Sequence, residues 1–153
     1  MANCDNPRTG SEFEKAVRAY FAKQGLLLVP KMSVPVGVGA TKKPHRFDLG
    51  SESPPVLVEC KCHLWTEGGN SPSAKLAVWN EAMFYFACAP KEYRKLFVVQ
   101  RSLRGEGSLA DHYLSRYEHL VPEDVEFWEL DPATGQGRSV GLKRDEARRP
   151  TMR

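Results

Sequence analysis

The segment PPVLVECKCHLW, residues 54–65, changes from apolar to polar partway along. Three apolar residues at 56–58 are followed by Glu59, Lys61 and His63, whose side chains are costly to bury without partners. Successive side chains alternate between the two faces of a strand, so these three share one face. We therefore expect one face of this strand to pack in the core and the other to carry chemistry or contact water.

An aspartate lies one predicted hairpin upstream of this strand. Asp48, ten intervening residues and then Glu59-Cys60-Lys61 resemble the PD-(D/E)xK motif of the restriction-endonuclease-like nuclease superfamily, with Phe47 in the position of the motif's proline. An acid-x-Lys tripeptide is expected about once by chance in a chain of this composition, so the specificity comes from the surrounding pattern. The resemblance implies metal-dependent cleavage of phosphodiester bonds.

The chemistry of that reaction explains the residue types. Hydrolysis needs an activated water and a neutralised anionic transition state, and a bound divalent metal ion can provide both. Mg²⁺ prefers oxygen ligands, so Asp48, Glu59 and the backbone carbonyl of Cys60 are the expected metal ligands, with Mn²⁺ as a substitute ion. Lys61 lies about 7 Å along the strand from Glu59 and would stabilise the phosphate or orient the attacking water. The alternative is that Glu59 and Lys61 are solvated neighbours on the exposed face of an edge strand.

Glu14 and His63 are further candidates. The family often places a metal-site glutamate on its first helix, so Glu14 is included as a catalytic residue and metal ligand, with Glu12 as a less favoured substitute. Ser11-x-x-Glu14 also has the form of a helix capping box, and that alternative stays open. His63 is assigned to nucleic-acid binding, against the alternative of an ordinary surface or hydrogen-bonding histidine.

The segment TKKPHR, residues 41–46, places three positive charges directly before the motif aspartate. We expect Lys42, Lys43 and Arg46 to track a nucleic-acid backbone beside the site, because basic side chains bind phosphates without regard to sequence. A flexible surface hairpin is the alternative.

The four cysteines, at positions 4, 60, 62 and 88, have no regular spacing and no secretory context. We therefore expect reduced thiols rather than a disulfide framework. Cys60, Cys62, His63 and, as a further candidate, Cys88 are zinc-capable types, but the spacing lacks the usual C-x₂₋₄-C form and both Cys60 and Cys62 face the predicted core. Buried small apolar residues are the preferred interpretation.

The elements that must position these residues follow from hydrophobic periodicity. Their order, helix, three-stranded meander, helix and strand, matches the implied family core over about residues 10–101, and an extra helix and strand follow. The expected fold class is α/β (α+β), with a mixed central sheet flanked by helices. The second helix is apolar nearly all round and is expected to be buried. The expected helices are 11–25, about 71–89 and 108–120, and the expected strand segments are 26–30, 33–40, 46–50, 56–62, 95–100 and 125–130.

Length and charge predict one domain over residues 1–135 followed by a basic, flexible tail at 136–153. Residues 136–153 have a net charge of +4, whereas the whole chain has a formal net charge of +3. Residues 1–135 therefore have a net charge of −1. The N-terminus lacks the pattern of a signal peptide, and the longest apolar run is far shorter than the ~20 residues of a membrane-spanning helix. We therefore expect a soluble cytoplasmic protein.

Together these patterns predict a Mg²⁺-dependent nuclease that acts on DNA, with no membrane partner and no small-molecule cofactor. A catalytically inactive nucleic-acid-binding or assembly module of the same fold, or an RNA nuclease, is the alternative. Because a double-strand cutter commonly pairs two such sites, we also consider a homodimer. Target specificity and biological pathway do not follow from the residues.

Overall fold

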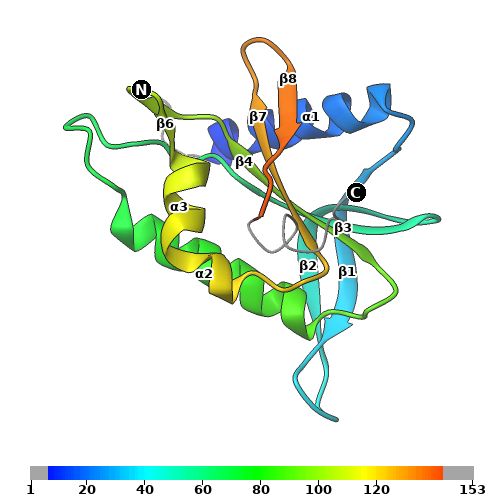
Figure 1. The fold of residues 1–153 in the computed structure, drawn as a ribbon. Helices are drawn as coiled ribbons and strands as arrows, with labels where there is room; N and C mark the ends of the chain where they lie inside the picture. The colour runs from blue at the N-terminus through cyan, green and yellow to red at the C-terminus, as the bar shows by residue number, and fades with distance from the viewer. Residues whose placement is uncertain (1–6, 143–153) are drawn as a thin grey trace, which may run out of the picture.

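The computed structural model describes residues 7–142, which form a six-stranded mixed sheet covered by three helices (Figure 1). The helices are α1 (Pro7–Lys23), α2 (Ser73–Cys88) and α3 (Leu109–Tyr117), the last continued by a 3₁₀ turn at Glu118–Leu120. The strands of the sheet are β1 (Val29–Val36), β2 (Lys43–Glu52), β3 (Pro55–Lys61), β4 (Arg94–Gln100), β7 (Val125–Asp131) and β8 (Gln136–Ser139). A separate two-stranded ribbon pairs β5 (Leu103–Arg104) with β6 (Gly107–Ser108).

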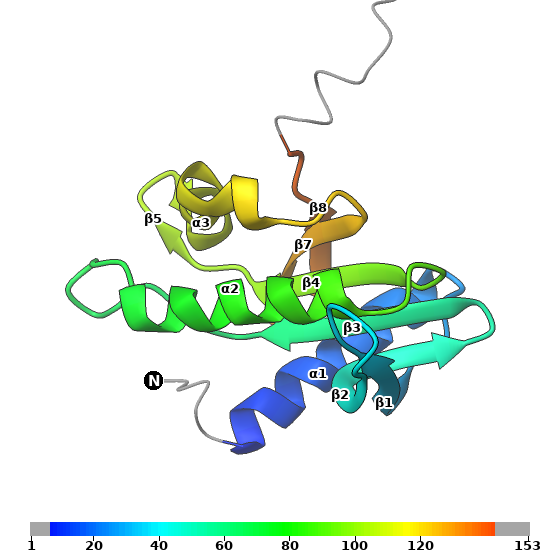
Figure 2. The same cartoon turned by 90° about the horizontal axis from the view of Figure 1, so that it is seen from below.

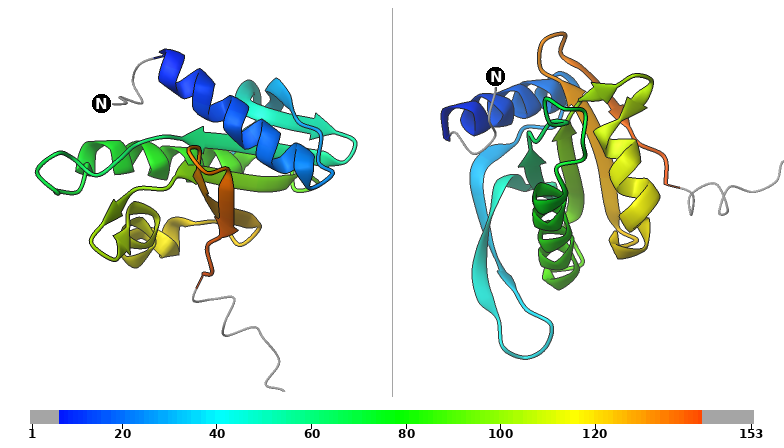
Figure 3. Two further views of the ribbon diagram at one scale, coloured as in Figure 1. Left: turned by 90° about the horizontal axis from the view of Figure 1, so that it is seen from above. Right: turned by 90° about the vertical axis from the view of Figure 1, so that its left-hand side faces the viewer.

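The sheet has the strand order β1-β2-β3-β4-β7-β8. The first three strands form an antiparallel meander, β3, β4 and β7 run parallel, and β8 closes the far edge as an antiparallel strand. Helix α1 lies on one face, and α2 and α3 lie on the other (Figures 2 and 3). The expected α+β class with a mixed sheet flanked by helices is therefore confirmed.

Each face of the sheet has its own apolar layer. Phe13, Val17 and Phe21 recur every fourth residue on α1 and are buried against the sheet. On the opposite face, Trp79 of α2 and Tyr113 of α3 pack in a cluster of aromatic rings that includes residues of β4 and β7. The central strands are thus covered on both sides, as the continuous apolar runs of β3 and β4 require.

Helix α1 begins earlier than predicted. It starts at Pro7, a residue suited to the first helical position, and ends before Gly25, whose φ of +83° favours glycine. Ser11 consequently lies inside the helix rather than at its cap. The capping-box alternative for Glu14 is therefore wrong, because that motif requires the serine to precede the first helical turn.

Helix α2 was expected to be buried on all sides, and this expectation is wrong. Leu76, Trp79 and Met83 are buried on the sheet, but the Phe84 side of the helix is exposed, with 61% of that residue accessible. The sheet covers only one side of the helix, and α3 packs beside it without enclosing it (Figure 2). No element among residues 7–142 covers the rest.

The basic residues before the expected strand at 46–50 were predicted to connect two strands, but β2 already includes residues 43–45. Strand β2 begins at Lys43, which pairs with Val36, and Arg46 pairs with Ser33. Apolar segments predicted as two strands form the single strand β1, in which Lys31 takes a φ of 61°. The longer β1 supplies backbone partners for the basic residues, which extends the ladder beyond the predicted boundary.

The C-terminal part of the chain adds α3, β7 and β8. Ser108 caps α3, because the backbone N–H of Asp111 donates to Ser108 Oγ over 3.0 Å. The predicted tail boundary at residue 136 is wrong: β8 begins there, and Val140 and Leu142 are buried. The pairing of β8 with β7 explains the difference. Residues 143–153, the rest of the predicted tail, lie outside the described residues.

Over residues 7–142, no helix is both long enough and apolar enough to cross a membrane.

Candidate active site

The motif aspartate lies where two strands of the meander separate. Strands β2 and β3 pair from Glu52↔Pro55 to Leu49↔Val58, and the ladder stops there. Just beyond the end of the ladder, the Cys60 backbone N–H on β3 donates to Asp48 Oδ2 on β2 over 2.8 Å. The carboxylate thus takes a donor that would otherwise need a strand partner. This bond fixes Asp48 at the fork between the strands.

Glu59 lies at the same fork and is only 8% exposed. Burial raises the pKa of its carboxyl well above the usual range, and a hydrogen bond to Asp48 and the negative charge of Asp48 raise it further. The positive charge of Lys61 opposes this rise. In the metal-free protein this environment favours the protonated form of Glu59, and a cation could take the place of that proton.

A cleft of about 280 Å³ opens beside the fork. Its lining includes Glu14 from α1, Asp48 from β2 and Lys61 at the end of β3. Burial raises the pKa of Glu14, the charge of Asp48 raises it further, and the charges of Lys31 and Lys61 lower it. Four predicted residues, these three and Glu59, therefore lie in one electrostatically coupled region.

His63 also lines this cleft, as predicted for a residue on the Glu59 face. The buried indole of Trp79 donates to His63 Nδ1 over 2.9 Å, so the neutral imidazole carries its proton on Nε2. Lys75, in the first turn of α2, lines the same cleft and was missed by the sequence reasoning. Its only sequence signal is its place beside buried Leu76, which indicates no chemistry.

His45 is a second residue that the prediction did not single out. Its Nε2 lies 4.0 Å from Glu59 Oε2 and is buried, with no hydrogen-bond partner among the described residues. Its ring stacks on Tyr85, with centroids 3.8 Å apart and planes inclined by 12°. Burial lowers the pKa of His45, which favours the neutral imidazole, against the charges of Asp48 and Glu81. The sequence signal available for His45 was its spacing of two residues from Phe47, which places both side chains on one face of a strand.

The structure does not gather the three predicted basic residues into the cleft. Lys42 Nζ donates to the Gly37 carbonyl over 2.7 Å and so braces the hairpin tip. Lys43 lines a different cavity under α2, and Arg46 is exposed on the opposite face of β2. Their contact with nucleic acid stays a prediction.

The donors available to a metal ion are two carboxylates and a backbone carbonyl. Among residues 7–142, no three His, Cys, Asp or Glu side chains are grouped so as to hold a metal, and the role of Glu14 as a ligand stays a prediction. The N–H and C=O of one strand residue point to the same edge, so the Cys60 carbonyl faces the fork to which its N–H donates. These three oxygen donors fit a hard cation that completes its shell with water.

The cysteines do not form a zinc site among the described residues. Cys60 and Cys88 carry free thiols, whereas Cys62 is disulfide-bonded. The expectation of reduced thiols is therefore wrong for Cys62. Cys4 lies outside the described residues.

Comparison of the chain with protein-family models, curated proteins and solved structures finds no match. The functional argument therefore depends on the residues at the fork and on their geometry.

Proposed function

We propose that the protein is a Mg²⁺-dependent nuclease that hydrolyses phosphodiester bonds in DNA. The observation that carries this proposal is the pair of carboxyl groups at the β2–β3 fork, where buried Glu59 has a strongly raised pKa beside Asp48. A buried pair of acids is costly to a protein unless a proton or a cation offsets the charge. The acids match a cation, and the adjacent Lys61 in an open cleft matches a phosphate.

The proposed metal ligands are Asp48, Glu59 and the Cys60 carbonyl, with Mn²⁺ able to replace Mg²⁺. A bound divalent ion supplies Lewis-acid catalysis and a more acidic water. The backbone bond from Cys60 holds Asp48 Oδ2 in place, and the side-chain hydrogen bond between Glu59 and Asp48 keeps the Glu59 carboxyl beside it. Glu59 must lose its proton to bind the ion, so proton release accompanies metal binding.

Lys61 is proposed to hold the scissile phosphate. It lines the cleft, and its charge acts on both Glu14 and Glu59. A cation at this position neutralises charge that develops on the phosphate oxygens. Glu14, across the cleft, is proposed to orient water in the outer part of the site, and His63 and Lys75 to contact the nucleic-acid backbone.

The order of the elements supports assignment to the restriction-endonuclease-like superfamily. Helix α1, the β1–β3 meander, α2 and β4 follow the order of that family's core, and the motif acids lie on β2 and β3. Under this proposal α3, β7 and β8 are additions at one edge of the sheet.

A non-catalytic nucleic-acid-binding or assembly module of the same fold is the second candidate. One observation favours it: no group of three acidic, histidine or cysteine side chains within residues 7–142 is placed to hold a metal. Such a module would bind nucleic acid equally well in EDTA and in Mg²⁺, and it would not cleave.

The deciding experiment is incubation with linear duplex, circular, single-stranded and branched DNA, and with RNA, in Mg²⁺, Mn²⁺ or EDTA. We expect metal-dependent DNA cleavage by the wild type and at least a hundredfold loss in Lys61→Ala, the scale on which a single transition-state contact acts, about 10²–10³. Lys15→Ala, an exposed change on the outer side of α1, is the matched control and should cleave normally. Equal turnover by Lys61→Ala would overturn the assignment, and RNA cleavage alone would transfer it to RNA.

A further inference from the structure

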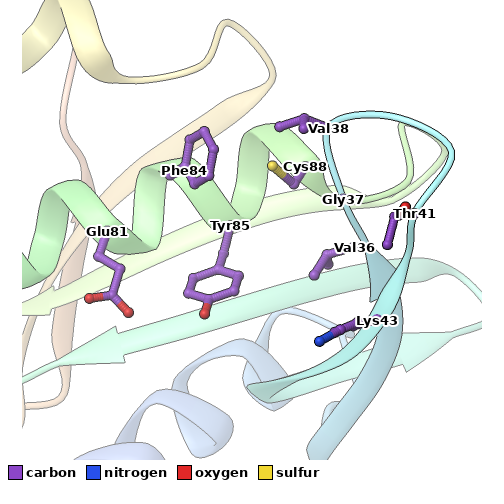
Figure 4. A pocket seen from close by; sticks show the side chains of 9 residues that line it. All are labelled: Val36, Gly37, Val38, Thr41, Lys43, Glu81, Phe84, Tyr85 and Cys88. Atoms are coloured by element: carbon purple, nitrogen blue, oxygen red, sulfur yellow. The ribbon is translucent and has the colours of Figure 1, made fainter.

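A second cavity, of about 430 Å³, lies between the tip of the β1–β2 hairpin and the C-terminal half of α2 (Figure 4). The helix contributes an acidic and two aromatic side chains, and the hairpin contributes valines and a lysine. Its main lining residues are Val36, Val38, Lys43, Glu81, Phe84 and Tyr85.

This cavity is connected to the proposed active site through stacked rings. Tyr85, in its wall, stacks on His45 at a centroid separation of 3.8 Å. His45 Nε2 in turn lies 4.0 Å from Glu59 Oε2. Only two side chains therefore separate the cavity from the buried carboxyl at the fork.

Helix α2 also joins the two hollows along its length. Val78 lines the cleft at the fork, and Glu81 and Tyr85 line the second cavity, at spacings of three and four residues that keep them on one side of the helix. The seven steps of helical rise from Val78 to Tyr85 span about 10 Å. Stacked nucleotides of one strand are about 3.4 Å apart, so this is two to three nucleotides.

The chemistry of the cavity suits a flat aromatic ligand with polar edges. Phe84 is 61% exposed and Val38 is 84% exposed, so large apolar surfaces face water at the rim. Lys43 donates hydrogen bonds and Glu81 accepts them, which matches the mixed donor and acceptor edge of a nucleobase. An aromatic wall binds any base by stacking, because every base has a π-face.

We propose that this cavity binds an unpaired nucleobase, two to three nucleotides from the scissile phosphate. The inference deepens the proposed function and rests on it, because a strand seated at the fork is what brings a base to the cavity. A base within a duplex is stacked on both sides and paired at its edge, so it must leave the helix to enter. The substrate class is therefore DNA with unpaired nucleotides beside the cut: single strands, flaps or branches.

The test combines an abasic scan with a variant of the cavity wall. Affinities for a fluorescent single-stranded oligonucleotide and for its duplex are measured in EDTA, with one base removed at each position in turn. Phe84→Ala should weaken single-strand binding about tenfold, within the range of one lost base stack, and leave duplex binding unchanged. One abasic position should reproduce the loss, and Phe84→Ala should add nothing at that position.

Two control variants isolate the aromatic ring. Phe84→Tyr keeps the ring and should bind as the wild type does, and Leu27→Ala removes a side chain that is 76% exposed elsewhere and should also bind normally. Because Phe84 and Leu27 are exposed, the binding changes measured in these variants do not report a loss of folding. Additive effects of Phe84→Ala and every abasic position would overturn the proposal, even where wild-type cleavage in Mg²⁺ upholds the nuclease assignment. A change in oligomeric state with unchanged base dependence would also overturn it, by making the surface an interface between copies.

Discussion

The Glu59 carboxyl and the Asp48 carboxyl are placed together in a buried environment that disfavours two negative charges. Three features define this environment: burial of Glu59, the hydrogen bond between the two acids, and the backbone bond from Cys60 to Asp48. Lys61 supplies a positive charge but does not cancel the effect of burial. Under the proposed function the pair is arranged for a cation at some cost to the metal-free protein, which is the pattern expected of a site selected for function.

The raised pKa of Glu59 predicts an unusual pH dependence of stability. The folded protein keeps a proton that the unfolded chain releases above the usual glutamate pKa, so this contribution is present in full below that pKa and is lost as pH rises through the raised one. In EDTA the melting temperature should fall as the pH rises from the usual glutamate pKa through the raised pKa of Glu59. Mg²⁺ or Mn²⁺ should stabilise more strongly at the upper end, because the ion binds the deprotonated acids.

Glu59→Gln is the variant that isolates this effect. It removes the titrating group while keeping the shape of the side chain, so its melting temperature in EDTA should vary less with pH than that of the wild type. Parallel pH profiles for the two proteins would contradict the assignment of the effect to Glu59. The raised pKa of Glu14 acts in the same direction, and Glu14→Gln provides the comparison.

Residue types and strand alternation were sufficient to place Asp48, Glu59, Lys61 and His63 together, because these positions depend only on one hairpin and one strand. His45 and Lys75 could not be predicted in this way. His45 approaches Glu59 because β2 begins at Lys43 and continues past the predicted boundary. Lys75 reaches the cleft from α2, and the packing of that helix on the sheet is a tertiary property that local pattern does not contain.

At the scale of elements, the positions and types of the helices followed from periodicity, but several boundaries did not. Helix α1 extends back to Pro7 through a turn that has no apolar stripe, so the amphipathic pattern began too late. Strand β8 reads GlnGlyArgSer at 136–139, a polar segment without strand character. Its pairing with β7 and the bonds from Arg138 to Glu129 hold it in the sheet, and these partners lie outside its own sequence.

Gly50 in β2 tests the close packing of the meander that supports the site. A Cβ at this position would lie 2.6 Å from Met32 side-chain atoms and 2.6 Å from the Val56 carbonyl oxygen. We expect Gly50→Ala to destabilise the protein by about 1–3 kcal/mol, as overpacking does. Gly39→Ala is the control, since its Cβ would meet no atom within 4 Å. Urea denaturation of both variants measures the difference, and equal stabilities would contradict the close approach of β1 and β3 to Gly50.

At the scale of the whole molecule, as far as residues 7–142 describe it, the basic residues of the cleft and of the β1–β2 hairpin lie on separate surfaces rather than in one patch. Lys61 and Lys75 line the cleft at the fork, Lys43 lines the second cavity, and exposed Arg46 lies on the other face of β2 from Lys43. The sequence indicated where the positive charges cluster along the chain but not which face each would occupy. Strand alternation separates Lys43 from Arg46, and the fold brings Lys75 in from a distant segment.

The hairpin residues nevertheless predict a salt effect. If Lys42, Lys43 and Arg46 contact phosphates, replacing all three with alanine should reduce the slope of log affinity against log salt by about 0.7 per lost contact on single-stranded DNA. Lys42 is bonded to Gly37, so two contacts are expected rather than three. A titration of binding against NaCl measures the slope. An unchanged slope would remove the hairpin from the interface.

The central claim, that the β2–β3 fork is a metal site, is tested most directly by melting scans of the wild type and Asp48→Asn in EDTA and in several millimolar Mn²⁺ or Mg²⁺. Asparagine keeps an oxygen that can accept the Cys60 N–H, so the substitution removes the charge and preserves the bond. We predict an equal or higher melting temperature for the variant in EDTA, because the substitution removes the neighbouring negative charge that disfavours ionisation of Glu59. We also predict that metal raises the melting temperature of the wild type alone, since the ion binds only the folded state. A destabilised variant together with a metal-insensitive wild type would contradict the claim.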